Sequence, residues 1–157
     1  MASISIRPYQ PTDHAYIMST MRMTLVKSPF MQGIHPAVMD TLLGPVVTLF
    51  SIAVATPTAD SNTILGYIAY QGPNIVGFIF VRPGLPRRKG LAEKLIAHAG
   101  IAKGEIISPF LVTNRFDGVT FPKFAESKGY TIRHRPYLPL QLMADTVLPQ
   151  DAQAESK

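Results

Sequence analysis

The stretch VRPGLPRRKGLAEKL, residues 81–95, decides the fold of this chain. A predicted apolar strand runs into a loop with three consecutive bases, and a helix is predicted to begin at Gly90. The first backbone N–H groups of a helix have no partner within it, and the helix dipole is positive there. Gly90 and Ala92 carry little bulk, so an anion could approach the backbone closely. The stretch therefore predicts a site for a pyrophosphate group.

The pattern on either side of this stretch predicts alternating strands and helices. Strands are expected over 3–7, 46–55, 64–71, 75–82, 106–113 and 130–135, with 136–143 as the same or a further strand. Helices are expected over 12–26, 35–44, 90–103 and 120–128. Gly44-Pro45 is expected to end the second helix, because proline disrupts a helix interior. This order predicts an α/β (α+β) fold with a mixed, mostly antiparallel central sheet of about six to seven strands, flanked by helices on both faces.

Length and composition indicate one domain over 1–144 with a polar, flexible tail over 145–157. Of the 157 residues, 46% are hydrophobic and 16% are charged, which excludes an intrinsically disordered chain. No apolar run approaches the roughly 20 residues of a membrane-spanning helix, and no secretory leader is visible. We therefore expect a cytoplasmic protein with no membrane partner. The absence of cysteine excludes disulfides and thiolate chemistry, and the four histidines lack ligand spacing, so no metal site is predicted.

The positive charge is concentrated in the second half of the domain. The formal net charge is +5, yet residues 82–135 hold eleven bases and four acids, a net charge of +7. Such a one-sided distribution favours an anionic partner, and both a phosphorylated cosubstrate and a nucleic acid fit it.

The stretch also resembles a known family. RRKGLA at 87–92 resembles the R/Q-x-x-G-x-G/A signature with which GNAT acyltransferases bind the pyrophosphate of acetyl-CoA. V-x-P at 81–83 is similar to the end of the family's fourth strand, and KGY at 128–130 to its closing K-x-G-F/Y region. Ile6-Arg7 followed by Asp13 is similar to its IR…D opening. The resemblance covers most of 4–143.

The resemblance implies an acetyl-CoA-dependent N-acyltransferase, in which a primary amine attacks the thioester directly. The acceptor would be a small-molecule or macromolecular amine. A backbone N–H on the splayed fourth strand, at Val81, would stabilise the oxyanion. The residues that would contact acyl-CoA are Val81, Arg82, Arg87, Arg88, Lys89, Gly90, Leu91, Ala92 and Asn114.

The catalytic groups are less clearly marked than the acyl-CoA site. The tyrosine that often serves the family as general acid is replaced by Ala125, and no acid lies within 75–81. Tyr70 and Asn114 are the candidate catalytic residues. Tyr67 and Tyr70 lie on one predicted strand at a spacing of three, so they are expected to face opposite sides.

Two other functions stay open on the sequence alone. The missing tyrosine and acid fit a domain that binds acyl-CoA without catalysis. The chain is also similar to small phage-encoded GNAT-like proteins, some of which modify DNA bases; the protein would then act in the host cytoplasm, with the basic half contacting phosphates. The methionine-rich segment over 11–50 is expected to pack in the core, with an acceptor pocket or a homodimer surface as the alternative.

Overall fold

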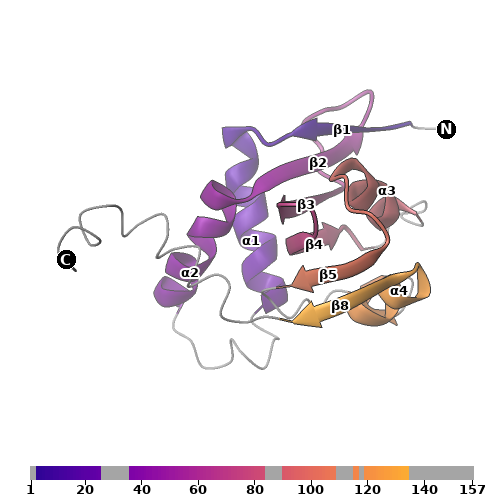
Figure 1. Ribbon diagram of the computed structural model, residues 1–157. Helices are drawn as coiled ribbons and strands as arrows, with labels where there is room; N and C mark the ends of the chain where they lie inside the picture. The colour runs from indigo at the N-terminus through magenta and orange to yellow at the C-terminus, as the bar shows by residue number, and fades with distance from the viewer. Residues whose placement is uncertain (1–2, 26–35, 84–89, 109–114, 117–118, 135–157) are drawn as a thin grey trace, which may run out of the picture.

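The computed structural model describes residues 3–25, 36–83, 90–108, 115–116 and 119–134 (Figure 1). The strands are β1 (Ile4–Pro8), β2 (Ser51–Pro57), β3 (Gly66–Gln71), β4 (Ile75–Val81), β5 (Gly104–Ser108), β6 (Arg115–Phe116), β7 (Val119–Thr120) and β8 (Tyr130–His134). The helices are the 3-10 turn η1 (Pro11–Asp13) and α1 (His14–Leu25), α2 (Pro36–Leu49), α3 (Leu91–His98) and α4 (Phe121–Ser127). Among the described residues, no helix is long and apolar enough to cross a membrane.

Six of the strands form one mixed sheet in the order β1-β2-β3-β4-β5-β8. The first four strands are antiparallel neighbours, whereas β5 runs parallel to both β4 and β8. The strands β6 and β7 form a separate antiparallel pair. The predicted mixed, mostly antiparallel sheet is thus confirmed.

The sheet is covered by helices on both faces, as the sequence predicts (Figure 1). Side chains alternate along a strand, so neighbouring residues of β3 and β4 enter different layers. Tyr67 and Phe78 pack with α1 and α2, whereas Ile68 and Ile79 pack with α3 and α4. These four side chains are fully buried.

The helix α2 is longer than the sequence predicts. It passes through Gly44-Pro45 and ends at Leu49, so the expected strand over 46–55 begins only at Ser51. The reason is that the apolar side chains of Leu43, Val46 and Phe50 follow each other at helical spacing into the core under α1 and α2. Their burial outweighs the cost of a proline inside the helix, which is about 3 kcal/mol.

The helix α3 is shorter than predicted, because a glycine ends it. Gly100 has φ +77°, and its N–H donates to Ala97 O. The N–H of Ile101 donates to Ile96 O, and both isoleucine side chains are buried in the same cluster. These are the features of a Schellman motif. Gly129 follows α4 with φ +94°, which confirms the predicted left-handed cap.

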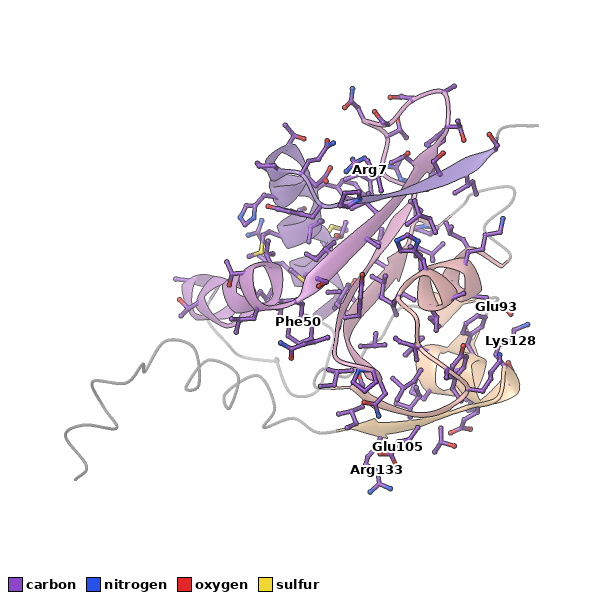
Figure 2. The ribbon with its side chains drawn as sticks, turned by 45° about the horizontal axis from the view of Figure 1, so that its top comes forward. Arg7, Phe50, Glu93, Glu105, Lys128 and Arg133 are labelled. Carbon is purple, nitrogen blue, oxygen red and sulfur yellow. The ribbon has the colours of Figure 1, made fainter. Side chains whose placement is uncertain are left out.

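The strand β4 contains a β-bulge at Gly77. Ala69 of β3 pairs with Phe78 and Tyr70 with Val76, so Gly77 is the extra residue. A Cβ atom at Gly77 would lie 2.5 Å from Cε2 of Phe50, whose buried ring follows α2 (Figure 2). Glycine is therefore required at this position by contact between β4 and the end of α2.

We predict that Gly77→Ala destabilises the fold by about 1–3 kcal/mol, because the Phe50 ring must move. Phe50→Leu in the same chain should restore part of the loss, since leucine lacks the outer ring atoms. Gly44→Ala is the control: its Cβ would meet no atom of the described residues within 4 Å, and alanine favours a helix. Urea unfolding measures all three, and a Gly77→Ala variant as stable as the wild type would contradict the contact.

Candidate functional site

The first turn of α3 presents backbone N–H groups beside an open glycine. Gly90 precedes the helix with φ +83°, and a Cβ atom there would have no neighbour within 4 Å among the residues that the structure describes. The first helical bond runs from Lys94 N–H to Gly90 O at 3.0 Å, so the three N–H groups before it have no intrahelical acceptor. Leu91 and Ala92 bury their side chains in the core, leaving only their backbone to contact a ligand. The bases at 87–89 lie outside the described residues.

An ion pair neutralises the carboxylate in this helical turn. Glu93 lies 3.2 Å from Lys128 Nζ, which follows α4 and also lies 5.8 Å from the ring of Phe124 (Figure 2). Both charged side chains are partly exposed, so the pair adds little stability. The pair nevertheless matters for an anion at the start of α3. Lys128 offsets the negative charge of Glu93, which would otherwise repel that anion.

The end of β4 directs a backbone N–H toward the β5 edge. Val81 is opposite Gly66 of β3, and Arg82 N–H donates to Leu65 O at 2.8 Å. Successive N–H groups of a strand point to alternate edges, so the N–H of Val81 points away from β3. Within the described residues, β4 pairs with β5 only at Ile75 and Ile107. In the described part of the chain, β4 and β5 thus meet at the start of β4. Val81, at the other end of β4, lies roughly 20 Å from that contact.

The side chain of Arg82 lies on the opposite face from α3. Alternate side chains at the end of β4 point to the same face of the sheet, and one such series is Phe78, Phe80 and Arg82. The two phenylalanines of this series pack with α1 and α2. Arg82 Nε donates to the Tyr16 hydroxyl at 3.3 Å, and its guanidinium carbon lies 5.4 Å from the centre of that ring. The structure thus brings Arg82 to α1 rather than to Gly90.

The two tyrosines of β3 face opposite sides, as predicted. Tyr67 is fully buried, shares a hydrogen bond of 2.6 Å with Thr20 and donates to Ile17 O at 3.2 Å; burial raises its pKa far above the usual range. Tyr70 packs half-buried against the other layer, beside the bulge in β4. Tyr70 of β3 pairs with Val76 near the start of β4, whereas Val81 is the last residue of β4. The second candidate, Asn114, lies outside the described residues.

A partly buried ion pair joins β1 to the start of α1. Its two residues, Arg7 and Asp13, are singled out in the sequence only through the IR…D resemblance. The Arg7 guanidinium donates two hydrogen bonds of 2.8 Å to the Asp13 carboxylate. Burial disfavours the Asp13 charge, but the bonds from Arg7 and from Gln10 N–H outweigh it and hold the pKa of Asp13 below its ordinary value. The described residues contain no group of three His, Cys, Asp or Glu that could hold a metal ion.

No protein-family model and no curated protein sequence matches the chain. A GCN5-related N-acetyltransferase from Rhodopseudomonas palustris is similar in structure at 16% identity and a TM-score of 0.42, over 63% of this chain and 64% of that one. The aminoglycoside N-acetyltransferase AAC(6')-Iy in complex with CoA is similar at 15% identity and a TM-score of 0.42, over 94% and 88%. An aminoglycoside acetyltransferase from an uncultured soil metagenomic sample is similar at 16% identity and a TM-score of 0.37, over 84% and 76%. Likenesses this distant assign neither a family nor an activity to the chain.

We predict that Asp13→Asn removes a pH-dependent part of the stability. A carboxylate with a lowered pKa in the folded state stabilises it above the unfolded pKa of about 3.9 and loses that effect as the pH falls through the folded value. The variant should therefore be clearly less stable than the wild type at pH 7, with the difference shrinking below about pH 4. Glu105→Gln, in an exposed pair with Arg133, is the control and should change stability little. Equal differences for Asp13→Asn at pH 7 and pH 3 in urea unfolding would refute the assignment.

Proposed function

We propose that this protein is an acetyl-CoA-dependent N-acyltransferase that acetylates a primary amine. The observation that carries the proposal is the β4–loop–α3 unit: a strand followed by a glycine with positive φ and a helix whose first N–H groups lack intrahelical acceptors. The RRKGLA signature lies in this same unit. A pyrophosphate is the ligand that this combination of backbone donors, open space and bases suits best.

Each part of acetyl-CoA then has its own group on the protein. The N–H groups of Leu91, Ala92 and Glu93 would hold the pyrophosphate, with Arg87, Arg88 and Lys89 adding positive charge. No atom of the described residues fills the space at the Cβ position of Gly90, which supports this fit, because a side chain there would stand where the phosphates approach. Asn114 is the proposed contact for the pantetheine arm.

The transfer step needs the amine, the thioester and one oxyanion donor in place. The amine nitrogen bonds to the acetyl carbon, the carbon–sulfur bond breaks, and the proton lost by the amine balances the thiolate that leaves. The Val81 N–H is the proposed donor to the oxyanion, which its direction toward the β5 edge supports. Tyr70, which the sequence suggests as a catalytic residue, pairs with Val76, five residues along β4 from Val81 and so roughly 16 Å away, which is too far for it to transfer this proton. Positioning alone can supply several kcal/mol of the rate.

Binding of acyl-CoA without turnover is the second candidate, and one observation favours it. The helix α4 offers no proton-transfer group at the position where the resembled family often has tyrosine. Ala125 is fully buried there, and Phe121 and Phe124 beside it are buried in the same apolar cluster.

The charge argument for a nucleic-acid partner is weakened by contacts inside the protein. Among the described residues, two of the bases within 82–135 are paired with carboxylates of the protein itself. These pairs are Lys128 with Glu93 and Arg133 with Glu105. DNA binding that falls steeply with added salt would nevertheless restore this candidate.

We predict that Gly90→Glu weakens CoA binding at least tenfold, because it places bulk and negative charge at the pyrophosphate. Gly100→Glu is the matched control. Gly100 has a similar φ, follows the opposite end of the same helix and has no described atom within 4 Å of its Cβ position. Both variants carry backbone strain of about 1 kcal/mol, so strain alone cannot separate them. Calorimetric titration with CoA measures the difference, and equal losses in the two variants would rule out the proposed site.

Turnover separates the enzyme from the binding domain. Thioester cleavage should be detectable with acetyl-CoA and at least one member of a panel of primary amines, including an aminoglycoside, a polyamine and a lysine peptide. Saturable CoA binding with no cleavage for any amine would support the second candidate instead.

A further inference from the structure

A pocket of about 420 Å³ lies on the face of the sheet that α1 covers, away from α3. Three separate parts of the chain form its walls. Thr12 and Tyr16 come from η1 and α1, Asn62 and Thr63 come from the loop between β2 and β3, and Arg82 follows β4. A pocket of this size holds a small molecule rather than only a water or an ion.

The Arg7 side chain ties two of these walls together. Besides its two bonds to Asp13, its Nε and Nη2 atoms donate to Ser61 O at 3.1 and 2.9 Å. The Asp60 carboxylate accepts the Asn62 N–H at 3.0 Å, which orders the loop from within. The start of α1 and the loop are therefore held in fixed relation, and a preformed site loses less entropy when a ligand binds.

Arg82 supplies the positive charge that faces the pocket. The described part of the chain places no carboxylate within ion-pair distance of it, and only its Nε has an acceptor there, the Tyr16 hydroxyl. Its two Nη groups carry four further N–H donors. Asp13 also lines the pocket, but Arg7 already neutralises its carboxylate. The Asp60 carboxylate accepts the Thr63 hydroxyl at 2.5 Å on the loop wall, so its negative charge partly offsets that of Arg82. The attraction for an anion therefore rests on the Nη donors of Arg82 rather than on the net charge of the pocket.

We propose that this pocket binds the oxyanion of a small molecule, a carboxylate or a phosphate monoester, through the guanidinium of Arg82. The planar fork of the arginine guanidinium suits both a carboxylate and a phosphate. The side-chain amide of Asn62 and the Tyr16 hydroxyl provide further donors. This site is separate from the proposed pyrophosphate site, since Arg82 and α3 belong to opposite faces of the sheet. Arg7 acts as a positioning residue.

Titration of the ¹⁵N-labelled full chain with inorganic phosphate and, separately, with citrate tests the proposal. Saturable shifts are expected at the amides of Thr12, Asn62 and Thr63 and at Arg82 Nε–H with at least one of the two probes. Arg82→Gln should weaken binding about tenfold or more. Arg82→Lys, which keeps the charge without the fork, should lie between it and the wild type. Lys123→Gln removes an exposed charge on α4 and should have no effect.

The outcomes distinguish this site from the proposed acyl-CoA site. The shifts at 62–63 should persist in Gly90→Glu, the variant expected to lose CoA. The stronger of the two probes identifies the ligand as a phosphate or a carboxylate. Three results would contradict the oxyanion site. In the first, neither probe moves these signals, and in the second, phosphate moves only the amides of 91–93. In the third, Arg82→Gln and Lys123→Gln lose binding equally. The acyl-CoA proposal would stand in each of those cases.

Discussion

The central strands are apolar on both faces, and this constraint organises the whole domain. Tyr67 and Phe78 are fully buried on one face, and Ile68 and Ile79 on the other, so the sheet must be covered by two helical layers. Burial of one large apolar side chain is worth about 1.5–3 kcal/mol. Several such side chains on α2 exceed the cost of Pro45, which explains why the helix continues through it.

Because both faces are covered, β4 separates two surfaces that lie close together in the sequence. Val81 enters the layer under α3, and the chain continues to Gly90 and its open helix terminus. Arg82, one residue later, lies over Tyr16 of α1 and lines the pocket on the other side. The end of one strand therefore positions both proposed sites, with the β-bulge at Gly77 between this end and the point where β4 joins β5.

The ion pair of Arg7 and Asp13 has a role beyond local stability. Asp13 is buried, whereas Arg7 keeps 14% of its side chain exposed, so removal of one partner costs less than the roughly 3–5 kcal/mol typical of a fully buried pair. Here the same guanidinium also holds Ser61 O, so the pair connects β1, the start of α1 and the β2–β3 loop. Surface pairs such as that of Glu105 and Arg133 make no comparable connection. Two walls of the proposed oxyanion pocket are thus joined by the hydrogen bonds of one side chain.

Local chemistry by itself determined the sheet class, the helices on both faces, the opposite orientation of Tyr67 and Tyr70, and the left-handed glycine at 129. These follow from side-chain alternation and from the conformations that only glycine adopts readily. The end of α2 could not be predicted, because Pro45 signals a stop that burial of Val46 and Phe50 overrides. The partner of Arg82 and the pocket around it were decided only by the tertiary structure. Residues near 12, 62 and 82 meet there because two layers pack on one sheet, and no local pattern records contacts between such distant segments.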